Sequence, residues 1–322
     1  MTGKPSVLVS VGKENFPEDV AAALRDIAEV EYVAGDCARQ RGTARAVVVG
    51  TEPITEGYLA AGPYLQLVAR FGVGYDAVDV PACTKRRIYV GHTPEILSAA
   101  VADLTWALIL GWMRRLPEGD SYTRREWGKR QQGFPFGFDL AGKTLGILGL
   151  GRIGTEVAKR GQGFDMRLLY HDVVRRPEVE DAYRIERVDW TTLLRQADVL
   201  TLHAPLEDST AKLLNAAALR QMKPSALVVN TSRGGVIDQA ALATALVQGV
   251  IAGAALDVFE EEPIPLDAPL LTAPNLLLMP HAASATWETR RKMAERCAEN
   301  VRACLKGQRP PFVVPEQKDC RF

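Results

Sequence analysis

Residues 144–172 read TLGILGLGRIGTEVAKRGQGFDMRLLYHD. An apolar run is followed by three glycines in the spacing GxGxxG, by a helical pattern, and by a second apolar run that ends near Asp172. This order predicts a βαβ unit that binds a dinucleotide, with Asp172 accepting hydrogen bonds from an adenosine ribose. A glycine-rich turn that binds nothing is the simpler interpretation, but two strands, a helix and an acid in register argue against it.

The three glycines of this motif each meet a separate steric requirement. Gly149 permits a tight turn after the strand, Gly151 lets a pyrophosphate approach the backbone because it has no Cβ, and Gly154 lets the helix pack closely on the sheet. The first turn of the helix, at Arg152 and Ile153, would present free N–H groups and the positive end of the helix dipole to the phosphates.

The composition is that of an ordinary globular protein. The chain has 322 residues, enough for two domains with buried cores, and its 39 Lys and Arg residues balance its 39 Asp and Glu residues. This charge balance does not predict binding to nucleic acid or to an anionic membrane. The first strand-like run is broken by Gly12, so no signal peptide is expected, and the longest apolar run, 104–113, is too short for a membrane span.

The cysteines are odd in number and scattered, with no CxxC pair. They are Cys37, Cys83, Cys297, Cys304 and Cys320. This pattern suits reduced thiols and argues against a disulfide framework and against a zinc site. We therefore expect a cytoplasmic protein without a bound metal.

Two series of β-rich runs alternate with helical patterns and predict an α/β fold with two doubly wound parallel sheets. The first series comprises 7–11, 30–33, 46–49, 67–71 and 88–90, and the second comprises 144–148, 166–170, 199–202, 226–230, 251–256 and 276–279. A long helix is expected over 98–116, with Asp238 capping a later one. A final helix over 284–307 would return the chain to the N-terminal domain.

Polar side chains follow the strands of the second series, and ligands bind at the carboxyl ends of strands in open parallel sheets. These side chains lie in His203-Ala204-Pro205, Thr231-Ser232-Arg233, Asp257, Glu262 and His281. Such a set suits a nicotinamide-dependent enzyme that acts on a carbonyl or an alcohol. His281 would transfer the proton, Glu262 would orient the imidazole and stabilise its charged form, and Arg233 would offer a planar fork to a carboxylate.

Each of these three residues also has a simpler interpretation: a structural histidine, a solvated charge and a surface cation. His171 and His203 are interpreted as structural or cofactor-adjacent, and His92 as inert. Hydrolase functions have little support, because the sequence contains no GxSxG, no Cys–His pairing and no HExxH.

Several ordered motifs resemble those of the D-isomer-specific 2-hydroxyacid dehydrogenases, over nearly the whole chain. They are LGLGRIG (148–154), VNTSRGGVID (229–238), ALDVFEEEP (255–263) and PHAASAT (280–286), with RFGVGYD (70–76) similar to the family's substrate loop. Within the family, VGHTPEIL (90–97) and RRLPE (114–118) resemble the glyoxylate/hydroxypyruvate reductase branch.

The resemblance implies two Rossmann-like domains with the active site in the cleft between them, and a homodimer formed through the long helix. Residues 1–98, completed by 288–322, would form the substrate-binding domain, and residues 99–287 the NAD-binding domain. Arg233 would bind the substrate, Glu262 would support His281, and backbone N–H groups near Val73 and Gly74 would hold the substrate carboxylate. The implied cofactor-binding residues are Thr105, Gly149, Gly151, Arg152, Ile153, Gly154, Asp172, His203, Ala204, Pro205, Thr231, Ser232, Asp257 and Ala283.

These features predict an NAD(H)-dependent enzyme that interconverts a small 2-keto acid and its D-2-hydroxy acid, with glyoxylate or hydroxypyruvate as the first candidate. NADP stays open, because the reductase branch often uses it and Arg175-Arg176 follow Asp172 closely. The alternatives are a 3-phosphoglycerate or phosphite dehydrogenase on the same scaffold, and an NAD-sensing binding protein similar to the corepressors of this superfamily.

Overall fold

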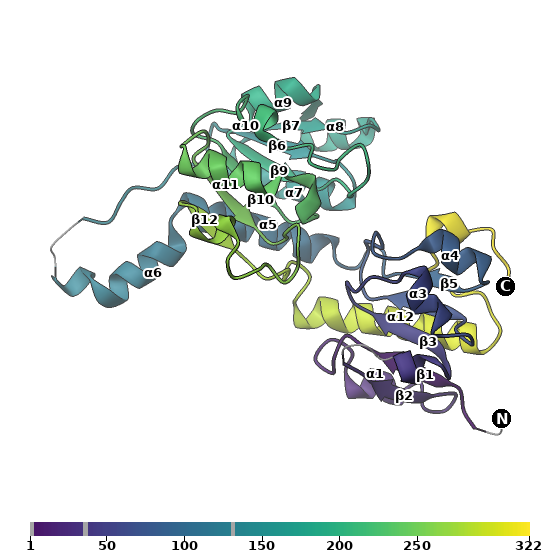
Figure 1. Ribbon diagram of the computed structural model, residues 1–322. Coiled ribbons are helices and arrows are strands. Elements are labelled where there is room, and N and C mark those ends of the chain that lie inside the picture. Colours follow the sequence, from purple (N-terminus) through teal and green to yellow (C-terminus); the bar gives the residue numbers. More distant parts are fainter. Residues whose placement is uncertain (1–2, 35–37, 130–132) are drawn as a thin grey trace. The chain divides into compact units, whose positions relative to one another are not determined.

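A computed structural model describes residues 3–34, 38–129 and 133–322, so Cys37 lies outside the described residues. The chain divides into two compact units (Figure 1). The first unit comprises Met1–Leu97 and Ala285–Phe322, and the second comprises Ser98–Ser284. The predicted fold class is confirmed, because each unit contains a parallel sheet with helices.

The first unit contains a five-stranded parallel sheet in the order β2-β1-β3-β4-β5, one of the common doubly wound orders. Its strands are β1 Ser6–Val9, β2 Glu29–Tyr32, β3 Ala44–Val49, β4 Leu67–Arg70 and β5 Tyr89–Gly91. Its helices are α1 Glu18–Ala22, α2 Ala38–Arg41, α3 Glu56–Ala60, α4 Val80–Lys85 and α12 Trp287–Leu305. Strand β4, which lies between β3 and β5, is buried throughout, as expected for a strand covered on both faces.

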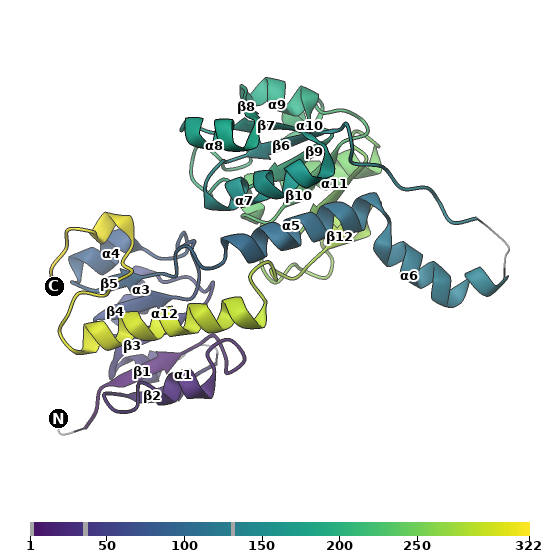
Figure 2. The ribbon, with the colours of Figure 1, turned by 180° about the vertical axis from the view of Figure 1, so that it is seen from behind.

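Helix α12 completes the first unit from the far end of the sequence (Figure 2). It packs on β3 and β4, and ion pairs from Arg291 to Asp19 and from Arg302 to Asp26 tie it to the α1 region. The helix begins later than the predicted residue 284, because Thr286 caps it by accepting a hydrogen bond from the Thr289 N–H.

The second unit contains a seven-stranded parallel sheet in the order β12-β11-β10-β9-β6-β7-β8. Its strands are β6 Thr144–Leu148, β7 Arg167–His171, β8 Ile185–Arg187, β9 Val199–Leu202, β10 Leu227–Asn230, β11 Gly253–Leu256 and β12 Leu276–Leu278. Strand β8 was not predicted, because it has three residues and buries only Ile185. The strand order reverses beside β6, where doubly wound sheets bind their ligands.

The helices of the second unit are α5 Ser98–Met113, α6 Leu116–Arg125, α7 Arg152–Gly161, α8 Pro177–Tyr183, α9 Trp190–Gln196, α10 Ala216–Leu219 and α11 Gln239–Val247. Asp238 caps α11 as predicted, by accepting a hydrogen bond from the Ala241 N–H. The single helix predicted over 98–116 is wrong at its end. Arg115 adopts a left-handed conformation (φ 53°), and Pro117 lies in the first turn of the new helix α6, so α5 and α6 are separate.

Helix α6 projects away from the rest of the second unit and buries none of its residues (Figures 1 and 2). Large apolar side chains on and after it are exposed, including Leu116 (60%), Trp127 (64%) and Phe136 (94%). We call residues 114–129 and 133–139 the arm. Nowhere in the described parts of the chain is a helix long and apolar enough to cross a membrane.

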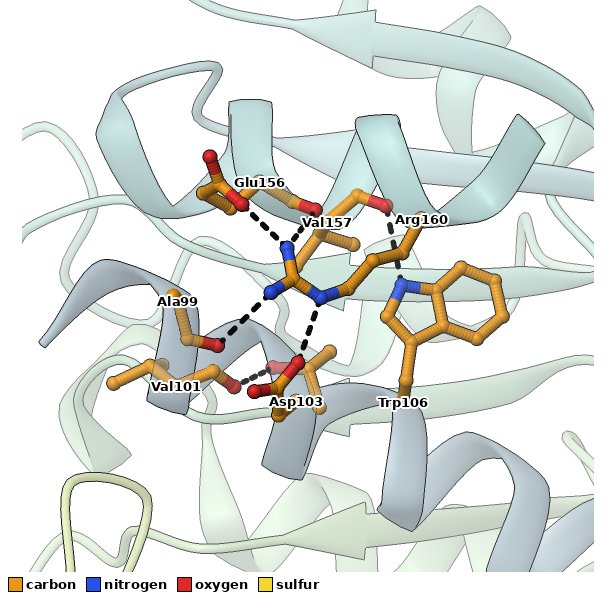
Figure 3. Close-up of polar contacts among 8 residues, drawn as sticks. Ala99, Val101, Asp103, Trp106, Glu156, Val157 and Arg160 are labelled. Carbon is orange, nitrogen blue, oxygen red and sulfur yellow. Dashed lines mark hydrogen bonds and ion pairs between the residues drawn. The ribbon is translucent and has the colours of Figure 1, made fainter. Parts of the chain in front are cut away.

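Helix α5 is held against α7 by side chains that Figure 3 shows. Arg160 of α7 donates to the Asp103 carboxylate at 2.7 Å and to the Ala99 carbonyl at 3.5 Å, and it also pairs with Glu156. Nearby, the Trp106 indole N–H donates to the Val157 carbonyl at 3.1 Å. The position of α5 along the sheet is therefore set by specific polar contacts as well as by packing.

Candidate active site

The glycine loop between β6 and α7 has the shape that the motif predicts. Gly149 has φ +87°, and a Cβ there would lie 2.9 Å from the backbone of His203 and Ala204. A Cβ on Gly154 would overlap the Gly149 carbonyl oxygen. A Cβ on Gly151, in contrast, would meet nothing within 4 Å, so this glycine borders open space. The loop therefore leaves room beside Gly151 for a group such as a pyrophosphate.

The N-terminus of α7 begins at this open space, with Arg152 exposed and Ile153 partly buried. The first turn of α7 contains no acidic residue, so its dipole and N–H groups favour an anion. Asp172 lies beside the loop, where one carboxylate oxygen accepts from the Leu150 N–H at 2.7 Å and the other accepts from the Val174 N–H at 2.9 Å. These features fit a dinucleotide, because a carboxylate retains further acceptor sites for ribose hydroxyls.

Two threonines from different elements meet at the carboxyl end of β10. The hydroxyl of Thr105, on α5, lies 2.9 Å from that of Thr231, and both residues are buried. The fully buried Asn230 shapes the loop that follows, since it accepts from the Ser232 N–H and donates to the Arg233 carbonyl. No role was predicted for Asn230, although a polar residue at the end of an apolar strand is a local signal for one.

The segment after β9 contributes a partly buried histidine beside the glycine loop. His203 Nε2 lies 2.8 Å from the Thr201 hydroxyl, and burial lowers the pKa of His203 to about 3. The ring is therefore neutral at physiological pH. Ala204 is buried and Pro205 is exposed. The backbone of His203 and Ala204 lies close to Gly149. Because the His203 ring is neutral, we do not expect it to donate a proton.

Glu262 and His281 come together as predicted. A Glu262 carboxylate oxygen lies 2.6 Å from His281 Nδ1, with 26% and 34% of the two side chains exposed. Burial raises the pKa of Glu262, but the hydrogen bond and charge of His281, the Phe259 N–H and the charge of Arg233 outweigh it, so the net pKa lies below its usual value. Glu262 is thus held ionised against the imidazole, and the contact engages Nδ1 of His281 and not Nε2.

Asp257 is fully buried and holds the backbone around His281. Its carboxylate accepts from the N–H groups of Ala282 at 2.7 Å and Ala283 at 2.9 Å, while its carbonyl accepts from the His281 N–H at 2.8 Å. Burial raises the pKa of Asp257 despite these two bonds. The three contacts support the left-handed backbone of His281 (φ 52°), which an isolated non-glycine residue rarely adopts.

Gly234 places the Arg233 loop against the acidic segment that follows β11. A Cβ on Gly234 would overlap the Phe259 backbone, so only glycine permits this approach. Arg233 donates to the Ser232 carbonyl at 2.8 Å and lies close enough to lower the pKa of Glu262. Within the second unit, Arg233, Glu262 and His281 therefore form one cluster.

The acidic run after Phe259 contains three glutamates with different surroundings. Glu260 accepts from the Gln239 N–H at 3.0 Å and lies 3.5 Å from the Lys212 ammonium, so it is bonded to the first residue of α11. Glu261 is exposed. Only Glu262 is bonded to His281, a distinction that spacing alone does not reveal.

The loop that resembles a substrate loop lies in the first unit, directly after β4. Val73 and Gly74 are both partly exposed. The carbonyl of Val73 is 3.1 Å from His92 Nδ1, and the carbonyl of Gly72 accepts from the Thr93 N–H at 2.9 Å. His92, which the sequence analysis interpreted as inert, thus contacts this loop.

The described part of the chain shows no group of three His, Cys, Asp or Glu side chains placed to hold a metal ion. Cys83, Cys297 and Cys304 are buried free thiols, and burial raises the pKa of each to about 12. Cys320 is a free thiol that is partly exposed.

Comparison with known proteins agrees with this geometry. Residues 106–283 match the family model of the D-isomer specific 2-hydroxyacid dehydrogenase NAD binding domain. The chain is 47% identical to a glyoxylate reductase of Korarchaeum cryptofilum over 271 residues, 83% of this chain and 81% of that protein. It is 41% identical to a glyoxylate reductase of Thermococcus litoralis over 324 residues, 97% of each. An NADPH-dependent glyoxylate/hydroxypyruvate reductase of Sinorhizobium meliloti, solved in complex with NADP and malonate, superposes with a TM-score of 0.87 at 33% identity and 98% coverage of both chains.

Proposed function

Because this chain belongs to the D-isomer-specific 2-hydroxyacid dehydrogenase family, we propose that it reduces a small 2-keto acid to its D-2-hydroxy acid with NAD(P)H. Glyoxylate or hydroxypyruvate is the substrate we propose, supported by the names of its relatives. The observation that carries the proposal is the 2.6 Å contact between Glu262 and His281 beside Arg233.

His281 is the proton donor in this proposal. NAD(P)H, when bound, supplies a hydride to the carbonyl carbon. The carbonyl oxygen needs a proton, and His281 donates it from Nε2, because Nδ1 is engaged by Glu262. The ionised Glu262 stabilises the imidazolium before transfer and fixes the direction of the ring.

Arg233 and the loop after β4 would bind the 2-keto acid. The guanidinium offers two parallel donors that match a carboxylate and its neighbouring carbonyl. The N–H groups of Val73 and Gly74 would donate hydrogen bonds to the carboxylate. Thr105, Thr231 and the Asp257 region would line the nicotinamide, with the hydroxyl contact of the two threonines keeping that surface rigid.

The test is a substrate panel with purified protein, following the loss of NADH absorbance. We expect the highest kcat/KM with glyoxylate or hydroxypyruvate, and a fall in kcat of roughly 10²–10⁴ in His281→Ala with unchanged affinity for NADH. Turnover of 3-phosphohydroxypyruvate alone, or NAD reduction by phosphite, would instead assign the chain to one of those dehydrogenases. Binding of NADH without turnover of any keto acid would favour a corepressor-like role.

We also infer a homodimer, formed through the long helix α5 and the arm that follows it. Its exposed side chains Leu116, Trp127 and Phe136 would be covered by a second copy, because apolar groups of this size are costly to leave in water. The cytoplasm is the compartment we propose, since Cys83, Cys297, Cys304 and Cys320 are free thiols.

A further inference from the structure

The segment after β5 holds the loop after β4 through two adjacent hydrogen bonds. The Thr93 N–H donates to the Gly72 carbonyl at 2.9 Å, and His92 Nδ1 lies 3.1 Å from the Val73 carbonyl. The His92 ring also packs against Tyr75 in a T-shaped arrangement, with centroids 5.6 Å apart and planes at 87°. Because a carbonyl only accepts, the Nδ1 of His92 must carry the proton in this contact.

The bond to Val73 sets the direction of the next N–H group. In a trans peptide, the C=O of one residue and the N–H of the next are fixed in one plane and point in opposite directions. The Val73–Gly74 bond is not among the cis peptides recorded for the described chain. When His92 holds the Val73 carbonyl, the Gly74 N–H therefore points away from His92, and the flexible Gly74 backbone loses its freedom to rotate that group.

His92 is itself held by a rigid part of the first unit. Its N–H donates to the Phe312 carbonyl at 2.9 Å, and its carbonyl accepts from Asn300 Nδ2 at 3.4 Å. Asn300 lies on α12, is fully buried, and accepts from the Phe312 N–H at 3.0 Å. Tyr75 is bonded on its other side to Glu316, at 3.1 Å. The position of His92 is thus determined by the core and not by the loop that it contacts.

We propose that His92 is a positioning residue that aims the Gly74 N–H at the substrate carboxylate. The proposal rests on the proposed function, in which Gly74 binds that carboxylate. A correctly aimed N–H makes a charge-assisted hydrogen bond, and this bond is made to the 2-keto acid in both the ground state and the transition state. Loss of the His92 bond therefore weakens substrate binding while the hydride and proton transfers stay intact.

The test compares three replacements of His92 in steady-state assays. His92→Leu removes the donor, and we expect KM for the keto acid to rise about tenfold, with kcat and KM for NADH within about twofold of wild type. His92→Asn places an N–H donor the same number of bonds from Cβ as Nδ1, so KM should return to near the wild-type value. His92→Gln places its donor one bond farther away and should resemble His92→Leu.

Tyr32→Phe is the matched control. It removes another side-chain hydrogen bond to a backbone carbonyl of the first unit, from Tyr32 to Phe16, at the opposite edge of the sheet. We expect Tyr32→Phe to lower the thermal midpoint of unfolding about as much as His92→Leu does, and to leave KM for the keto acid unchanged. If His92→Leu fails to fold, the difference between His92→Asn and His92→Gln decides the question.

If the wild-type enzyme is active and all three His92 variants have the same KM for the keto acid, the positioning role of His92 is wrong. The proposed function would not be affected by that result. A fall in kcat that His92→Asn does not restore would also overturn the positioning role. A wild-type protein that turns over no keto acid would overturn the proposed function, and the positioning role with it.

Discussion

At the scale of single residues, Glu262 provides a pH-dependent contribution to stability. Its folded-state pKa lies below the usual 4.5, because the hydrogen bond and charge of His281 outweigh burial. A carboxylate with a lowered pKa stabilises the fold above its unfolded pKa, and loses that contribution as the pH falls through the folded value. We therefore expect Glu262→Gln to lower the free energy of unfolding at pH 7, and the gap to wild type to narrow below pH 4.5.

Urea unfolding at a series of pH values measures this gap. Glu260→Gln is the control, because Glu260 lies in the same acidic run but contacts Gln239 and Lys212 instead of His281. A constant gap between wild type and Glu262→Gln across the series would contradict the assignment of the lowered pKa to the His281 contact.

Replacement of Arg233 by lysine tests whether the substrate needs the two parallel N–H donors of a guanidinium or only a positive charge. Lysine keeps the charge but loses the two parallel N–H donors, so Arg233→Lys should lower kcat/KM for the keto acid at least about tenfold. Arg195→Lys, an exposed position on α9, should leave kcat/KM unchanged. Equal efficiency of Arg233→Lys and wild type would show that the bidentate pairing is wrong.

At the scale of elements, we expect two glycines of the β6–α7 turn to have different roles, Gly154 in folding and Gly151 in NADH binding. A Cβ on Gly154 would overlap the Gly149 carbonyl, so Gly154→Ala should lower the free energy of unfolding by about 1–3 kcal/mol. A Cβ on Gly151 enters open space, so Gly151→Ala should fold normally and bind NADH more weakly. Denaturant unfolding and NADH fluorescence titration measure the two effects, and similar behaviour of the two variants would refute this division.

We expect the end of β7 to set the preference between NADH and NADPH. Asp172 is fixed by bonds to the Leu150 and Val174 N–H groups, so a 2′-phosphate would meet its negative charge. Arg175, a candidate partner for that phosphate, is paired with Glu180 at 2.8 Å. We expect NADH to be preferred over NADPH at least about tenfold in kcat/KM, since 1.4 kcal/mol of repulsion gives that factor. Measurement with both cofactors at one substrate decides this, and a preference for NADPH would mean that the arginines dominate.

At the scale of the whole molecule, the arm predicts the oligomeric state. Trp127→Asp combined with Phe136→Asp should convert a dimer to a monomer in sedimentation equilibrium, because a charge at these positions would be buried unpaired in the interface. Val247→Asp, at another exposed apolar position, is the control and should remain dimeric. A monomeric wild-type protein would rule out this use of the arm.

The local pattern of the sequence determined the elements and their order. Short runs rich in apolar or β-forming residues predicted every described strand except β8, which is too short and too polar to produce such a run. The glycine spacing predicted the turn before α7, because the steric needs of a turn are local. The break between α5 and α6 was missed, although Pro117 was its local signal.

Only the tertiary structure decided which polar groups are partners, because hydrogen bonds across loops depend on positions that distant segments set together. It placed Glu262 2.6 Å from His281 Nδ1, which gives the expected pairing its distance and ring nitrogen, and it made Asp257 a support for the His281 backbone. It also joined His92 to Val73, residues that no sequence periodicity links. Sequence pattern thus specifies where the chain turns and what it buries, whereas the contacts among Glu262, His281 and Asp257 exist only after the sheet has formed.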